Sequence, residues 1–160
     1  MNTQTLYHMA LVVHIAGLAM MAGTTLADYT MTKQFWKQFA ADKQQAFAIN
    51  KAMSKLVMLF GIGIILLVLS GISMMGLTSG MWGEQTWFRI KFALVIIIII
   101  NGLAVGRRQG NQLRKLVALE AGGEDTGTKL LKVKSNINWF HIIQLALFIV
   151  VFVLSVFKFN

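Results

Sequence analysis

The sequence contains no cysteine and no proline, and only 6 acidic residues stand against 15 lysines and arginines. Without cysteine the chain can form neither disulfides nor thiolate metal sites. Without proline, any kink in a helix must come from glycine or serine. The formal net charge of +9 could indicate a nucleic-acid partner. We exclude nucleic acid because the basic residues stand between long apolar runs, where they set topology and meet lipid headgroups.

The sequence is rich in apolar residues: 56% of its 160 residues are hydrophobic, and the mean hydropathy is +0.65. Such values are typical of an integral membrane protein, here a single domain over residues 1–160. A bilayer-spanning helix needs about 20 residues. Four runs reach that length, and we read the first as a span rather than a cleavable signal. The predicted spans are about 7–27, 56–77, 87–106 and 139–157. We therefore predict an all-α fold, a four-transmembrane-helix up-down bundle.

The basic residues also predict an orientation. They gather in two connections, residues 28–55 and 107–134, whereas residues 1–6 carry no charged side chain and residues 78–86 carry only Glu84. The positive-inside rule places both connections in the cytoplasm and both termini outside. We expect a multi-pass protein of a bacterial-type inner (plasma) membrane. Membrane lipid is one partner, and the small size and short external loops also favour a homo-oligomer.

Two ionisable residues lie at similar depths inside the predicted spans. His14 is about two helical turns into the first span, and Lys91 is about one turn into the third. Both spans begin outside, so both side chains lie in the outer half of the membrane. An ionisable group in lipid costs a few kcal/mol or more unless it snorkels or finds a partner. The question is therefore what His14 and Lys91 face.

One hypothesis is a haem site. A neutral imidazole is a good ligand for haem iron, and burial disfavours the charged form of a lysine, so His14 and Lys91 could supply two axial ligands to a haem between the first and third spans. The alternative is that His14 hydrogen-bonds between helices while Lys91 snorkels toward Trp87. Arg89 lies about 200° from Lys91 around the helix, so at most one of them faces the bundle interior.

The remaining intramembrane polar groups are secondary candidates. His141 lies near the cytoplasmic start of the fourth span, with Gln144 one turn on, and could hold a second cofactor or simply form a hydrogen bond. Asn101 is deep enough to need a partner, for which Ser70 is a candidate. Asp28 ends the first span and is predicted to form an interfacial ion pair. Its candidate partners are Lys55, Arg107 and Arg108.

Two further functions stay open. Thioethers suit Cu(I), and the adjacent pairs at 20–21 and 74–75 are among 10 methionines, which also serve as packing in apolar helices. A copper or small-cation transporter could line its path with Asn101, Ser70, Asp28 and methionines. A cofactor-free accessory subunit would use the polar groups for stability alone. The sequence shows no phosphate-binding loop, metal-spaced His or carboxylate pair, or nucleophile with its base.

Two short motifs resemble a known family. The stretch 12–19, Val-Val-His-Ile-Ala-Gly-Leu-Ala, resembles the first span of HemJ, a haem-binding four-helix protein linked to protoporphyrinogen oxidation, and of small membrane proteins related to CopD. The stretch 87–95, Trp-Phe-Arg-Ile-Lys-Phe-Ala-Leu-Val, looks like the HemJ-type Trp-x-x-x-Lys opening of the third span. Asn101 followed by Arg107 and Arg108 is similar to the end of that helix in CopD-type proteins.

The resemblance implies haem b with His14 and Lys91 as axial ligands. In this reading Gly17 makes room for the ring and Met21 or Leu18 lines it. The implied role is HemJ-like redox chemistry or electron transfer, with the electron donor and acceptor unspecified. The Pro-Arg pair expected after the first span is absent, which indicates a divergent relative of HemJ.

Overall fold

The computed structural model describes residues 2–157, apart from the side chain of Trp82, so residue 1 and residues 158–160 of the predicted domain lie outside it. Every element in the described range is helical. The α-helices are α1 (Thr3–Ala41), α2 (Lys43–Leu77), α3 (Thr86–Ile100), α4 (Arg107–Ala121) and α5 (Gly127–Val156). A 3-10 helix, η1 (Met81–Glu84), precedes α3, and a π-helical segment, η2 (Asn101–Gly106), joins α3 to α4.

The segments α3, η2 and α4 form one continuous run of 36 residues, so four helices are long and apolar enough to cross a membrane. The predicted four-helix membrane bundle is confirmed, while the sidedness of the termini stays a prediction. All four helices exceed the predicted spans. The 39 residues of α1 correspond to about 58 Å, at 1.5 Å per residue, against a hydrocarbon core of about 30 Å.

The excess length extends the bundle at one end. Only Asp42 separates α1 from α2, and its side chain caps α2 by accepting hydrogen bonds from the backbone N–H groups of Gln44 (2.9 Å) and Gln45 (3.3 Å). Residues 28–55 therefore extend the flanking spans; they do not form a separate helix along the headgroups. Apolar side chains of this stretch pack with α4 and α5 in a core formed by Phe35, Ala46, Met53, Leu113, Val117, Leu130, Val133 and Ile137.

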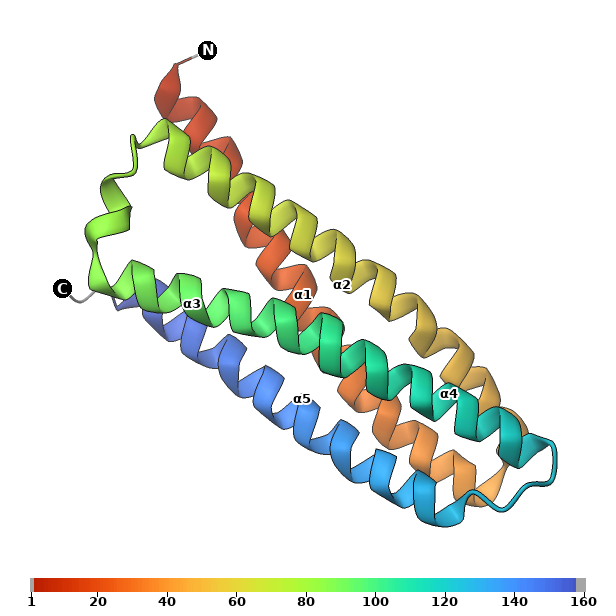
Figure 1. Cartoon of the computed structure of the whole chain (residues 1–160). Coiled ribbons are helices and arrows are strands. Elements are labelled where there is room, and N and C mark those ends of the chain that lie inside the picture. The colour runs from red at the N-terminus through yellow and green to blue at the C-terminus, as the bar shows by residue number, and fades with distance from the viewer. Residues whose placement is uncertain (1, 158–160) are drawn as a thin grey trace.

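The helices form two pairs. Figure 1 shows α1 with α2, and the α3–η2–α4 run with α5. The pairs lie together at the end that holds the α1–α2 and α4–α5 turns, which we name the basic end, and diverge toward the end that holds both termini, the terminal end. Burial follows the same trend. Among the described residues, α1 buries none before Gly17 and α2 none after Ser70.

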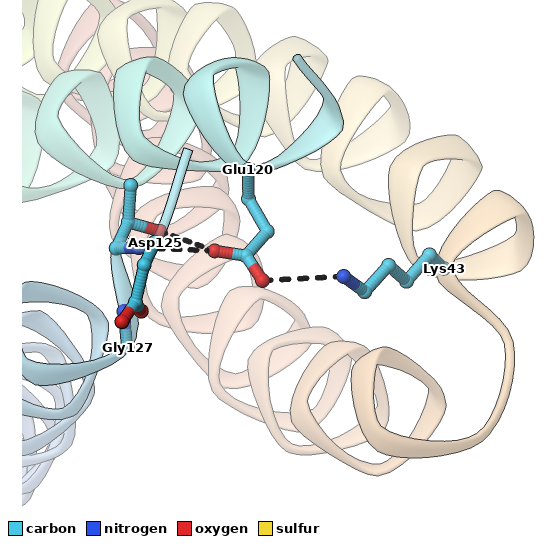
Figure 2. A network of polar contacts seen from close by, with 5 residues as sticks. Lys43, Glu120, Asp125 and Gly127 are labelled. Atoms are coloured by element: carbon cyan, nitrogen blue, oxygen red, sulfur yellow. Dashed lines mark hydrogen bonds and ion pairs between the residues drawn. The ribbon is translucent and has the colours of Figure 1, made fainter. Parts of the chain in front are cut away.

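The α4–α5 turn is fixed by a carboxylate at the basic end, as Figure 2 shows. Gly123 ends the helix in a left-handed conformation with φ 91°, which only glycine adopts without strain. The Glu120 carboxylate accepts hydrogen bonds from the Thr126 hydroxyl (2.6 Å) and backbone N–H (3.3 Å), and from Lys43 Nζ (3.2 Å). The turn is thereby tied to the start of α2.

Candidate functional site

His14 is positioned by a close contact between α1 and α2. A Cβ on Gly17 would lie 2.8 Å from the backbone N of Leu67 and 3.0 Å from the carbonyl of Gly63, so only glycine allows the two backbones this close. Gly17 lies one turn beyond His14 on the same face of α1. Gly71 of α2 faces the ring, and a Cβ there would make an ordinary contact of 3.4 Å with His14 Cε1. The contact therefore brings the imidazole onto the α2 backbone.

The hydrogen bonds of His14 determine its tautomer. Nδ1 lies 3.1 Å from the Leu67 carbonyl and 3.1 Å from Ser70 Oγ. Because a carbonyl only accepts, Nδ1 carries the proton in the Leu67 bond. The Ser70 hydroxyl donates to the Leu66 carbonyl at 2.5 Å, which leaves its oxygen free to accept from the imidazole. Nε2 of His14 then holds a lone pair and makes no hydrogen bond to any residue that the structure describes.

Lys91 lies on α3 with its side chain half-buried, one turn beyond the buried Trp87. Its charge acts electrostatically on the His14 imidazole, and the equal depth of the two side chains stays a prediction. Arg89 is exposed and donates from Nε to the Gly83 carbonyl at 2.9 Å. Of the two basic residues on α3, Lys91 is therefore the one associated with the bundle interior.

Gly17 and Met21, the two residues predicted to accommodate the haem beside His14, lie at the contact between α1 and α2. Met21 is fully buried, and its Cγ would lie 2.7 Å from a Cβ on Gly63. Gly17 makes the backbone contact described above. Both residues thus hold α1 against α2, and through that contact they position His14.

Asp28 of α1 and His141 of α5 form a close polar contact, nearer to the basic end than His14. His141 Nε2 lies 2.8 Å from Asp28 Oδ2, with the imidazole fully buried and the aspartate side chain 31% exposed. The predicted pairing of Asp28 with Lys55, Arg107 or Arg108 is wrong. The rotation of α5 presents His141 to Asp28 instead, and a fully buried imidazole that lacked this partner would lose its hydrogen bond.

Asn101 and Gln144 form a clamp between α3 and α5. Asn101 Nδ2 donates to Gln144 Oε1 at 2.7 Å, and Gln144 Nε2 donates to the Ile98 carbonyl at 2.9 Å. The predicted partner of Asn101, Ser70, is wrong, because Ser70 bonds His14 on the opposite helix pair. The π-helical segment begins at Asn101. A π-helical turn is wider than an α-helical turn, so it changes the direction of the side chains along the helix.

Gly102 and Gly106, near the two ends of the π segment, leave room for aromatic rings to pack against the backbone. A Cβ on Gly102 would lie 2.5 Å from the Phe60 ring, and a Cβ on Gly106 would lie 2.7 Å from the Phe140 ring. Phe60 comes from α2 and Phe140 from α5, so these two contacts seat the π segment between both helix pairs. Its local geometry is therefore held by packing as well as by the Asn101–Gln144 clamp.

The polar residues proposed to line a transport path are divided among three contacts: Ser70 with His14, Asn101 with Gln144, and Asp28 with His141. They do not join into one continuous row within residues 2–157. In the same range no group of three or more His, Asp or Glu side chains is placed to hold a metal ion. His14 and Lys91 are linked by the electrostatic effect of the Lys91 charge on the imidazole, and their role as a ligand pair stays a prediction.

Comparison with known proteins places the chain in a family. The family model described as a predicted integral membrane protein, DUF2269, matches residues 8–159. The chain belongs to the DUF2269 family. No curated protein and no solved structure gives a significant match. The DUF2269 description agrees with the four membrane-length helices, and the relationship to HemJ or CopD stays a prediction.

Sequence reasoning missed one feature of this DUF2269 chain, a groove at the basic end between α1 and α5. Its walls include Thr32, Trp36 and His141, each with a buried polar atom that lacks a hydrogen-bond partner in the described chain. The available signal was the helical spacing of Tyr29, Lys33 and Trp36 on α1, which places them on one face. The groove appears only when α5 packs beside that face.

Proposed function

We propose that the protein binds haem b near the terminal end, between α1 and α3, and serves electron transfer or redox chemistry. His14 Nε2 and Lys91 Nζ would hold the haem iron. The observation that carries the proposal is the hydrogen bond that orients the His14 ring. Metal-bound histidines almost always donate their second ring N–H to a carbonyl or carboxylate, which fixes the tautomer and the ring orientation. His14 makes such a bond to the Leu67 carbonyl.

The donor set also fits this cofactor. An imidazole nitrogen and an amine nitrogen come from two different helices, α1 and α3, and the Lys91 charge acts on the His14 imidazole. The outer turns of α1 and α2 bury no described residue before Gly17 or after Ser70, so other helices leave their apolar surface uncovered. The flat, largely apolar ring of haem would pack on this uncovered face of α1 and α2, with its polar edges at the membrane boundary.

The work of the protein in this proposal is positioning. Gly17 and Met21 fix α1 on α2, the Leu67 carbonyl and Ser70 fix the imidazole plane, and Arg89 ties the start of α3 to η1. Haem b, when bound, supplies a one-electron couple whose potential depends on its axial ligands and burial. The carbonyl bond to Nδ1 raises the basicity of Nε2 as a ligand.

The visible spectrum of protein expressed with haem supplied tests the proposal. We expect a Soret band in the wild type, its loss or a marked weakening in His14→Ala, and a displaced band in Lys91→Ala. The matched control is His8→Ala, which removes an exposed histidine on the same helix. Circular dichroism and gel filtration establish that each variant folds. The absence of a Soret band from folded wild-type protein, or an unchanged band in folded His14→Ala, would overturn the proposal.

A further inference from the structure

The groove at the basic end has a volume of about 380 Å³ and is formed by α1 and the early turns of α5. It begins one residue beyond Asp28, where the predicted first span ends, so it lies at headgroup depth. None of its lining residues is a carboxylate. The residues that line it are Tyr29, Thr32, Lys33, Trp36, Lys37, Lys134, Asn138 and His141.

Three of these residues are lysines that make no ion pair within the described chain. Two of them lie over aromatic walls of the groove: Lys33 Nζ is 4.3 Å from the centroid of the Tyr29 ring, and Lys134 Nζ is 5.4 Å from that of Trp36. Lys37 is exposed on the same face of α1. Cation–π contacts hold the two ammonium groups beside the groove and leave their N–H donors available.

The groove also contains polar atoms whose hydrogen-bonding capacity is unused. Thr32 is 5% exposed and His141 is fully buried, yet Thr32 Oγ1, Trp36 Nε1 and His141 Nδ1 are buried without a partner in the described chain. A buried polar group without a partner is costly, so such groups generally bond to water or to a ligand. The indole N–H can only donate, and the hydroxyl can donate as well. An acceptor would satisfy the indole and the hydroxyl, whereas Nδ1 of a neutral His141 ring whose Nε2–H donates to Asp28 is itself an acceptor.

We propose that the groove binds a phosphate-bearing anion. The Trp36 indole and the Thr32 hydroxyl donate to its oxygens, while Lys33, Lys37 and Lys134 balance its charge. The headgroup of an anionic phospholipid and a soluble phosphate ester present the same chemistry here. The assignment is independent of the haem proposal, since it uses a different end of the bundle and different residues.

The experiment measures binding by native mass spectrometry of detergent-solubilised full-length protein. One arm adds phosphatidylglycerol, with phosphatidylcholine as the neutral comparison, and the other adds glycerol 3-phosphate. The groove variant combines Lys33→Gln with Lys134→Gln. The control combines Lys51→Gln with Lys129→Gln, which removes the same charge from the basic end outside the groove. We expect the groove variant to lose about fivefold in affinity per lysine and the control to lose less than twofold.

A second variant tests the donor without changing charge. Trp36→Phe keeps an aromatic ring beside Lys134 and removes only the indole N–H, and we expect it to weaken binding of the same phosphate compound. Preference for phosphatidylglycerol that the groove variant abolishes identifies a lipid headgroup, and binding of glycerol 3-phosphate without lipid preference identifies a soluble ester. Equal losses in the groove and control variants would overturn the proposal, as would full binding by Trp36→Phe.

Discussion

His141 Nε2 lies 2.8 Å from Asp28 Oδ2, although the two residues are 113 positions apart in the sequence. The bond joins α5 to α1, and so it links the two helix pairs near the level where they come together. The imidazole is fully buried while the carboxylate is 31% exposed. Removing the carboxylate would therefore leave a buried N–H unsatisfied, which is more costly than losing a bond at the surface.

We expect Asp28→Ala to lower the free energy of unfolding by about 1–3 kcal/mol, the cost of leaving a buried polar group without its partner. The measurement is unfolding in mixed micelles followed by circular dichroism. Glu124→Ala is the control, because Glu124 is an exposed carboxylate in the α4–α5 turn without a described partner. A loss in Asp28→Ala no larger than that in Glu124→Ala would show that the link does not stabilise the bundle.

The Asn101–Gln144 clamp predicts a coupled pair of substitutions. Gln144→Leu removes both the acceptor for Asn101 and the donor to the Ile98 carbonyl, and we expect a loss of about 0.5–1.5 kcal/mol, in the range for hydrogen bonds between membrane helices. Asn101→Leu should cost less in the Gln144→Leu background than in the wild type. Thermal unfolding of both single variants and the double variant measures this coupling. Simple additivity would mean that the two amides act separately.

The Gly17 contact predicts a difference between two glycines of α1. In Gly17→Ala the new methyl group would meet the Leu67 backbone at 2.8 Å, so the helices must move apart, and we expect destabilisation of about 1–3 kcal/mol. Gly23→Ala is the matched control because a Cβ there meets nothing within 4 Å, and alanine favours the helix. The comparison uses melting temperatures in one detergent. Equal melting temperatures would contradict the close contact.

Glu120 predicts a pH dependence at the basic end. The hydrogen bond from Thr126, followed by that from Lys43, holds the pKa of the Glu120 carboxyl below its ordinary value of 4.5. Because the folded state lowers this pKa, the carboxylate stabilises the fold at pH above 4.5 and loses that contribution as the pH falls through the lowered value. Glu120→Gln should therefore be less stable than the wild type at pH 7, and the difference in melting temperature should vanish in acid. A difference independent of pH would refute this linkage.

The bundle could be predicted from the sequence because apolar length alone identifies membrane helices. The equal depth of His14 and Lys91 is a prediction from the same counting of turns and stays one. Helix ends could not be predicted as well. The extension of α1 to Ala41 depends on packing of Phe35 against α4 and α5 residues in a core beyond the predicted span. An amphipathic stretch on the membrane surface would show a similar pattern.

Side-chain partners were the part that the sequence could not determine. Asp28 and Asn101 each needed a partner at a predicted depth, and depth alone did not identify it. The rotation of each helix about its axis determines the partner, and that rotation is set by contacts such as Gly17 with α2. The π-helical turn at Asn101 shifts the register of side chains after it, and no composition signal marks the shift.

The α4–α5 turn has a practical consequence for imaging this small protein. Glu120 fixes the turn to both Thr126 and Lys43, and the core around Phe35 holds the helices below it, so residues 122–126 cap a packed end of the bundle. A folded fiducial domain inserted between Gly123 and Glu124, or an antibody fragment raised against this tip, would move as one body with the membrane helices. Such a handle would supply the mass and asymmetry that particle alignment in cryo-electron microscopy requires.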